Sequence, residues 1–127
     1  MKWILIIVCI SLTEIVFHSC KKEISCENCL PQNNPTNKPP VANAGPDQAI
    51  TLPVNSVTLD GSKSSNPDNN ITTYAWTKIS GPPVFTIPNA NAVQTAVTNL
   101  VQGTYLFELK VTDCGGLYSK DRIYASH

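Results

Sequence analysis

Cysteines are the residues of this sequence whose type and spacing could do chemistry, and three of them stand between positions 20 and 29. Cys26 and Cys29 form a CxxC pair, which occurs in thiol redox sites, in zinc sites and as a local disulfide. Redox chemistry needs a helix N-terminus to lower the thiol pKa, and no helix is predicted here. Zinc needs four ligands, and the remaining plausible donors are Cys114 and His127. The spacing therefore favours a disulfide between Cys26 and Cys29, with the redox and zinc sites as alternatives.

Cys114 is the cysteine that this disulfide leaves over. Two interpretations stay open. Cys114 keeps its thiol, or it pairs with Cys26 or Cys29 and leaves the other member of that pair as a thiol.

The sequence contains few of the residues that a hydrolase active site needs. A catalytic triad needs a histidine that can be oriented, and after residue 19 the sequence has only His127. A glycosidase needs two carboxylates across a cleft, whereas most acidic residues here fall in turns, where they bond their own backbone. Asp68 and Asp113 are candidate calcium ligands, but calcium takes six to eight oxygens and turn capping is the better interpretation. We predict no enzyme, no metal and no cofactor.

The N-terminus carries an export signal. Met1-Lys2 is followed by an almost unbroken apolar run over residues 3–17, which as a helix would rise about 22 Å, less than the ~30 Å hydrocarbon core. Glu14 further disfavours a permanent membrane helix, which is the alternative. Residues 1–19 are therefore predicted to be a signal peptide.

The end of this run resembles a bacterial lipobox. Phe17-His18-Ser19-Cys20 places a small residue directly before a cysteine. The resemblance implies that Cys20 is lipidated and becomes the mature N-terminus, which gives a membrane anchor. Ordinary secretion is the alternative. Lys21-Lys22-Glu23 resembles the charged tract of Gram-negative surface lipoproteins, which implies an outer-membrane or cell-surface location.

Residues 20–38 are predicted to be a tether, because they are rich in Pro and Asn and have almost no apolar content. An extended chain of this length reaches up to about 60 Å. The whole sequence has nine basic and nine acidic residues, so no basic field predicts nucleic-acid binding.

Residues 39–127 alternate short β-rich segments with turn signals. The clearest segment is 105–111, where Tyr105, Phe107, Leu109 and Val111 alternate with mostly polar residues, as in a half-buried strand. We predict an all-β domain of about seven strands, an antiparallel β-sandwich. Its core is predicted to contain Trp76 and the four apolar residues of this strand. The predicted strands are 49–52, 56–59, 71–79, 84–87, 92–100, 105–111 and 117–125.

This domain resembles the PKD (polycystic kidney disease) domain, an immunoglobulin-like module. The resemblance covers about residues 39–125 and rests on five blocks in order, at residues 39–47, 59–68, 74–76, 103–105 and 111–113. The sequence departs from the commonest pattern after Trp76, where Thr77-Lys78-Ile79-Ser80-Gly81-Pro82 replaces an acidic turn.

The resemblance implies an extracellular, non-enzymatic module for protein or carbohydrate binding. We therefore expect a surface lipoprotein anchored in the membrane that presents an interaction domain to an unknown protein or glycan. Tyr118 and Tyr124 are candidate ligand-facing aromatics. The alternative is a structural spacer, or the N-terminal stub of a larger surface protein.

Overall fold

The computed structural model describes residues 36–127. The predictions for the signal peptide, for Cys20 and for the Cys26–Cys29 pair fall outside these residues and stay predictions. No helix within residues 36–127 is long and apolar enough to cross a membrane.

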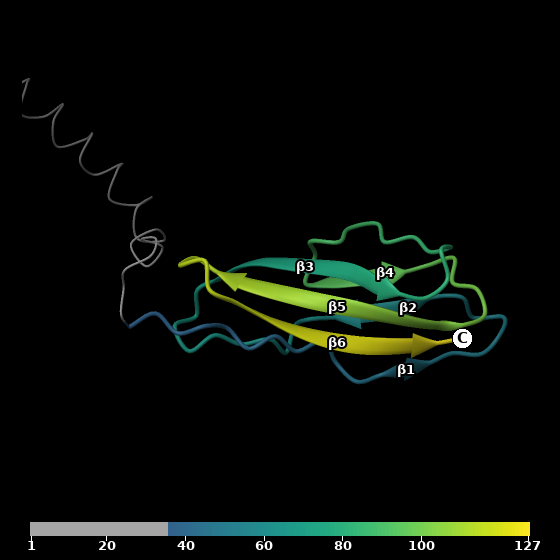
Figure 1. Ribbon diagram of the computed structural model, residues 1–127, viewed down its shortest axis with the longest axis horizontal. Helices are drawn as coiled ribbons and strands as arrows, with labels where there is room; N and C mark the ends of the chain where they lie inside the picture. The colour runs from purple at the N-terminus through teal and green to yellow at the C-terminus, as the bar shows by residue number, and fades with distance from the viewer. Residues whose placement is uncertain (1–35) are drawn as a thin grey trace, which may run out of the picture.

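The described chain folds into two β-sheets that face each other (Figure 1). A four-stranded sheet has the strand order β1-β6-β5-β3, and a two-stranded sheet pairs β2 with β4. The strands are β1 (Gln48–Ala49), β2 (Val57–Asp60), β3 (Ile71–Ser80), β4 (Gln94–Val97), β5 (Thr104–Asp113) and β6 (Tyr118–Ser126).

The all-β sandwich is confirmed, with two differences from the predicted pattern. The described residues contain six strands, because the segment 84–87 makes only an isolated bridge, between Thr86 and Thr98. Pro82, Pro83 and Pro88 flank this segment, and proline has no backbone N–H to extend a ladder. The sheet is also not wholly antiparallel, since the short edge strand β1 pairs in parallel with β6.

The core lies between the two sheets and is centred on β5. Tyr105, Phe107, Leu109 and Val111 are all fully buried, as expected from their alternation along the strand. Trp76 on β3 is 3% exposed and lies opposite Leu109 on β5. Its indole N–H donates a hydrogen bond to the Ala92 carbonyl at 3.1 Å, so burial leaves no unsatisfied donor.

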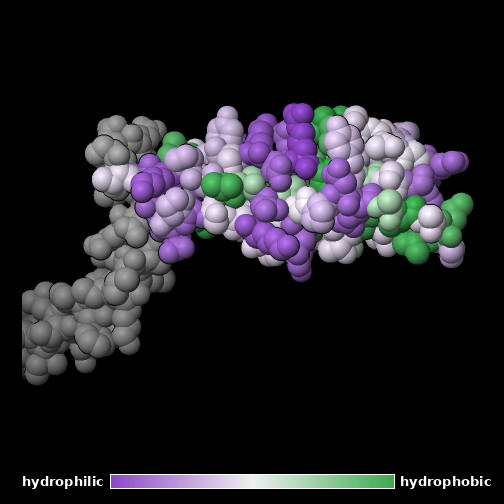
Figure 2. Space-filling view, turned by 90° about the horizontal axis from the view of Figure 1, so that it is seen from below, coloured by the Kyte–Doolittle hydropathy of each residue, from purple (hydrophilic) through white to green (hydrophobic). Residues whose placement is uncertain are grey.

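The two ends of the domain differ in polarity. The entry end is where residue 36 begins, and its segments meet through polar side chains of Asn37, Asp68, Asn70 and Asp113. Figure 2 shows hydrophobic residues gathered at the opposite end of the domain. We call this end the distal tip and define it as the loops 50–56, 81–87 and 98–103.

Candidate interaction surface

The outer face of β5 and β6 brings together exposed tyrosine side chains and several cationic side chains. Side chains on paired strands alternate between the two faces of a sheet, so the partners of the buried residues point outward. Four cross-strand pairs result: Leu106 with Tyr124, Glu108 with Arg122, Lys110 with Lys120, and Thr112 with Tyr118. We call Lys110, Tyr118, Lys120, Arg122 and Tyr124 the tyrosine–cation face.

Glu108 lies at the centre of this face and is almost covered. Its carboxylate accepts contacts from the Lys120 ammonium at 2.8 Å and from Arg122 Nε at 2.9 Å. The hydrogen bond from Lys120, followed by that from Arg122, holds the pKa of Glu108 below its usual value. Only 7% of Glu108 is exposed, whereas the side chains of Lys120 and Arg122 are 49% and 59% exposed. The cations therefore reach solvent while the acid that orients them does not.

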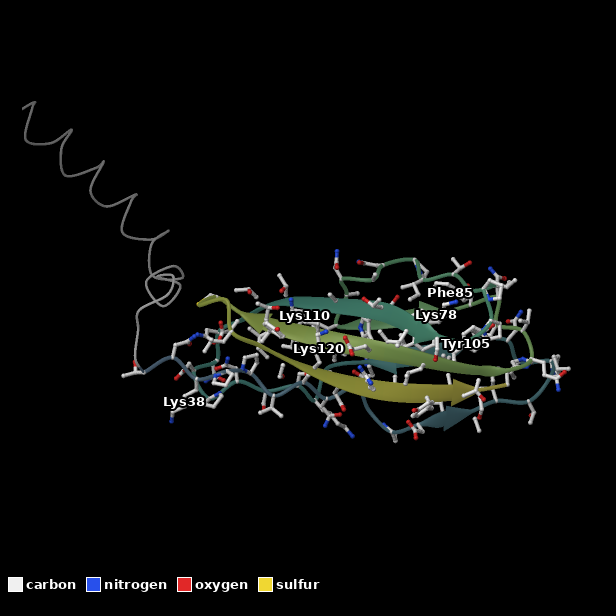
Figure 3. The ribbon with its side chains drawn as sticks, in the orientation of Figure 1. Lys38, Lys78, Phe85, Tyr105, Lys110 and Lys120 are labelled. Carbon is white, nitrogen blue, oxygen red and sulfur yellow. The ribbon has the colours of Figure 1, made fainter. Side chains whose placement is uncertain are left out.

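Lys110 and Lys120 lie directly opposite each other on neighbouring strands, as Figure 3 shows. Like charges in such a pair destabilise a sheet unless each finds another partner. Lys120 binds Glu108, and the Lys110 ammonium lies 4.3 Å from the centre of the Tyr118 ring. This cation–π contact places the Lys110 charge over one side of the Tyr118 ring.

Tyr118 and Tyr124 are 54% and 50% exposed, so half of each side chain faces solvent. They are six positions apart on β6, which corresponds to about 20 Å along the strand. Lys120 and Arg122 lie between them on the same side. The face therefore presents two aromatic rings at the ends of a cationic centre, with three cations to one carboxylate.

The acidic residues of the described chain are engaged within the fold. Asp60 Oδ1 accepts the Ser62 N–H at 2.8 Å, and the hydrogen bonds from Ser62 lower the pKa of Asp60. Asp47 accepts the Tyr124 N–H and Asp121 accepts the Ala44 N–H, both at 2.8 Å. Of these contacts only that of Asp60 is the local kind that the turn interpretation expects. Asp47 and Asp121 instead join loops to strands that are distant in the sequence, and Asp121 itself lies in β6.

The two candidate calcium ligands both hold the entry segment of the chain. Asp113 accepts the Leu117 N–H at 2.9 Å and the Asn37 amide at 3.0 Å. Asp68 accepts the Lys38 N–H at 2.7 Å. Within residues 36–127 no group of three or more His, Cys, Asp or Glu side chains is arranged to hold a metal ion. Asn37 and Lys38, which the sequence placed in the tether, are therefore attached to the sandwich.

Cys114 lies half-buried in the turn between β5 and β6. Its N–H donates a hydrogen bond to the Asn70 carbonyl at 3.0 Å. Cys26 and Cys29 are outside the described residues, so both interpretations of the cysteine pairing stay predictions.

Tyr118 and Tyr124, the candidate ligand-facing aromatics of the sequence, are exposed as expected, and their role in binding stays a prediction. The sequence did not indicate the cations between them. The alternation of β5 placed Glu108 and Lys110 outside, and this signal was available. Nothing local in the sequence shows that Lys120 and Arg122 converge on Glu108, because that convergence depends on the register of β5 with β6.

Comparisons with known proteins agree with the sandwich. The family model described as "K319L-like, PKD domain" matches residues 44–124. Dyslexia-associated protein KIAA0319-like protein of Mus musculus is 46% identical over 93 residues, which cover 73% of this chain and 8% of that protein. Low-density lipoprotein receptor-related protein 11 of Mus musculus is 36% identical over 97 residues, or 74% of this chain and 20% of that protein.

A solved structure gives the same result. The solution structure of the PKD domain from the KIAA 1837 protein is 46% identical, with a TM-score of 0.62. The match covers 67% of the present chain and 82% of the chain in the solved structure. The sequence relatives are much longer than this chain, which spans between 8% and 20% of their length.

Proposed function

Because this chain belongs to the K319L-like PKD domain family, we propose that it is a non-enzymatic interaction module which binds a protein partner bearing acidic side chains. The observation that carries the proposal is the tyrosine–cation face. Its side chains are half-exposed although none of them is needed to fill the core. Tyr and Arg are the residues most often found at the energetic centre of protein interfaces.

Three features favour a protein over a carbohydrate. The face lies on a sheet, and protein interfaces are broad surfaces rather than the concave pockets that hold small molecules. One side of the Tyr118 ring is covered by Lys110, which leaves it less suited to stack on a sugar. Lys120 and Arg122 are already oriented by Glu108, so a partner carboxylate meets cations whose side chains are partly ordered.

We further propose that the module is exported and lipid-anchored at Cys20, at the outer membrane or cell surface of a Gram-negative bacterium. Support comes from the apolar run before Ser19-Cys20 and from the Pro- and Asn-rich tether that follows. The intact mass of protein extracted from membranes tests this. A chain that begins at Cys20 with added acyl mass is expected, and a chain that retains Met1 or lacks acyl mass would refute the anchor.

The binding proposal is tested with the soluble chain from residue 21 and two probes, a polyglutamate peptide and a heparin oligosaccharide. The variants are Tyr118→Ser/Tyr124→Ser and Arg122→Gln. The control is Lys63→Gln, which removes an exposed cation from a loop outside the face. We expect saturable peptide binding that weakens about tenfold in either face variant, equivalent to about 1.4 kcal/mol, and is unchanged in the control.

The other outcomes refute the proposal in distinct ways. Binding of heparin alone, with the same dependence on the face, would assign a carbohydrate ligand. Binding that Lys63→Gln weakens as much as Arg122→Gln would indicate non-specific charge attraction. No binding of either probe would favour a structural spacer, which is consistent with the small part of the longer relatives that this chain matches.

A further inference from the structure

The two edges of β6 are covered to different extents by β5 and β1 (Figure 1). The Asp113 N–H donates to the Leu117 carbonyl at 2.9 Å, just before β6 begins. Bonded positions alternate along an antiparallel pair, so the odd-numbered residues of β6 direct their backbone N–H and C=O groups toward β5. The even-numbered residues direct theirs to the outer edge of the sheet. The Tyr124 N–H confirms this direction, because it donates at 2.8 Å to Oδ1 of Asp47, the residue before β1.

This outer edge is closed by β1 only at the end of β6, where β1 pairs with residues 125–126. Over residues 118–123, which we call the open edge, the backbone of β6 pairs with β5 and with no other strand of the described chain. No hydrogen bond from within residues 36–127 reaches the outward N–H and C=O groups of Tyr118, Lys120 and Arg122. These three residues are exposed, so their outward backbone groups are available to a further strand.

The segment that leads into β1 lies beside the open edge but does not pair with its backbone. The Ala42 N–H donates to Ser119 Oγ at 2.6 Å, and the Ala44 N–H donates to Asp121 Oδ2 at 2.8 Å. Ser119 and Asp121 alternate with the exposed residues of β6, so their side chains point to the same side of the sheet as the buried Ile123. The segment is therefore held on the core side of the sheet by side chains, and it forms no ladder with the open edge.

Gly45 and Pro46 explain why this segment does not extend β1 along β6. Gly45 has a φ of +80°, which turns the chain away from the direction of a strand. Pro46 has no N–H with which to continue a ladder. The chain before them pairs elsewhere, since Val41 and Ser65 exchange backbone bonds of 2.7 and 3.0 Å.

The opposite edge of the same sheet, on β3, is closed at its centre. The Trp76 N–H donates to the Ala90 carbonyl at 2.8 Å, and its indole N–H donates to the Ala92 carbonyl. The register of β3 with β5 also shifts near both ends of β3. Loops and bulges of this kind protect an edge strand from pairing with other chains. By contrast, β6 pairs with β5 in unbroken register over Tyr118–Ser126, which keeps the open edge straight.

We propose that the open edge binds an extended segment of the acidic partner, which joins the sheet as a further strand beside β6. Strand addition rests on the proposed function, because the partner is the same acidic protein, and it specifies how that partner binds. In this mode the main-chain hydrogen bonds provide affinity, and alternate side chains provide specificity.

The geometry of a sheet defines the sequence of the added strand. Residues directly opposite each other on neighbouring strands project to the same face, with Cβ atoms about 4.5–5.5 Å apart. Lys120 and Arg122 are two positions apart, so the partner presents two acidic residues with one residue between them. A residue two positions further along lies opposite Tyr118 and packs on its ring if it is apolar. The added strand is about six residues long, because Asp47 and β1 occupy the edge from Tyr124 onward.

Charge favours this occupant over a second copy of the chain and over the tether. A two-fold contact between two open edges would place Lys120 and Arg122 of one copy opposite the same cations of the other, and like charges in such pairs are destabilising. The acidic residues of the tether, Glu23 and Glu27, are four positions apart and do not have the alternate spacing.

The test uses the chain from residue 21 and a short peptide that alternates Glu and Thr. Two isomers of this peptide carry N-methyl groups, one on its Glu amides and the other on its Thr amides. An antiparallel added strand needs the Glu N–H groups, and a parallel one needs the Thr N–H groups. We therefore expect one isomer to bind about tenfold more weakly than the other, whereas a contact through side chains alone would bind both equally.

Amide exchange measured by NMR gives a second readout, on the protein itself. The N–H groups of Lys120 and Arg122 gain carbonyl partners when a strand is added. Their exchange should slow about tenfold when roughly nine-tenths of the chain has bound the unmethylated peptide, because only the free fraction then exchanges. The Tyr124 N–H is the internal control, since it is already bonded to Asp47 and its exchange should not change.

A matched pair of variants separates the backbone from the charge. Lys120→Thr removes the cation and keeps the N–H, whereas Lys120→Pro removes both. Proline is compatible with this position because the Lys120 N–H faces away from β5. If circular dichroism shows both variants folded, Lys120→Pro should bind the unmethylated peptide several-fold more weakly than Lys120→Thr.

The outcomes separate strand addition from the proposed function. Equal binding of the two methylated isomers, with no added protection of Lys120 and Arg122, would overturn strand addition and leave the acidic partner in place. A failure of the unmethylated peptide to bind would refute both. Protection of these amides before peptide is added would overturn strand addition as well. It would assign the open edge to the tether, or to a second copy if the protection rises with protein concentration.

Discussion

Removing one buried hydroxyl group should loosen the distal tip without disturbing the core. In Tyr105→Phe the ring remains stacked with Phe107, where the centroids are 6.0 Å apart and the interplanar angle is 2°. The change removes the hydrogen bond to the Val84 carbonyl and the one from the Val101 N–H. The two backbone groups then lose their partner in a partly buried site.

The magnitude follows from these two bonds. Each net hydrogen bond contributes about 0.5–1.5 kcal/mol, so Tyr105→Phe is expected to lower the free energy of unfolding by about 1–3 kcal/mol. For a domain of this size each kcal/mol shifts Tm by about 4–8 °C.

Urea unfolding followed by tryptophan fluorescence measures this change, with Tyr124→Phe as the matched control. Tyr124 is 50% exposed, so removal of its hydroxyl should change the free energy of unfolding by no more than about 0.5 kcal/mol. Equal effects of the two variants would refute the reasoning, because it assigns the difference to the buried bridge. An unchanged Tyr105→Phe would refute it as well.

Three other changes test separate parts of the structure. Trp76→Ala should lower the free energy of unfolding by about 3–5 kcal/mol in a urea titration, because it removes a buried aromatic ring and its bond to Ala92; a loss below 1 kcal/mol would contradict the placement of Trp76 in the core. The pKa of Glu108 is lower in the folded state than in the unfolded state. Its ion pairs therefore contribute their full stabilisation above the unfolded pKa of about 4.3, and this contribution is lost as the pH falls through the lower folded pKa. The stability difference between wild type and Glu108→Gln should therefore shrink as urea titrations move from pH 6 to pH 3, and a constant difference would exclude this origin. Gly103→Ala should lower Tm more than Gly116→Ala, since both positions have positive φ but only the Cβ at Gly103 meets Pro82, whereas nothing lies within 4 Å of a Cβ at Gly116; equal shifts would show that backbone strain alone is responsible.

The sequence predicted those parts of the fold that local patterns determine. The alternation of Tyr105, Phe107, Leu109 and Val111 identified the central strand and its buried side, because a half-buried strand imposes a period of two. The same alternation placed Glu108 outside. That Glu108 is nevertheless 7% exposed depends on long side chains from β6, which no local pattern contains.

The distal tip could not be predicted for the same reason. Leu52, Val84 and Val101 lie in separate loops, and an apolar residue in a loop has no period that reveals its neighbours. The position of Val84 beside Val101 depends on the Tyr105 hydroxyl, which bonds the Val84 carbonyl 21 residues away. It also depends on Gly103, where a Cβ would lie 2.8 Å from Pro82 Cγ. The composition of segment 84–87 also predicted a strand. Because prolines surround the segment, it makes only a single bridge, between Thr86 and Thr98, the residue that follows β4.

The proposal that the outer face of β5 and β6 is the binding surface is tested most directly by NMR. Amide resonances of the ¹⁵N-labelled chain are followed while the polyglutamate peptide is added. The account predicts saturable shifts at Lys110, Tyr118, Lys120, Arg122 and Tyr124, and none on β2 and β4 of the opposite sheet. Shifts confined to β2 and β4, or no shifts at saturating peptide, would contradict it.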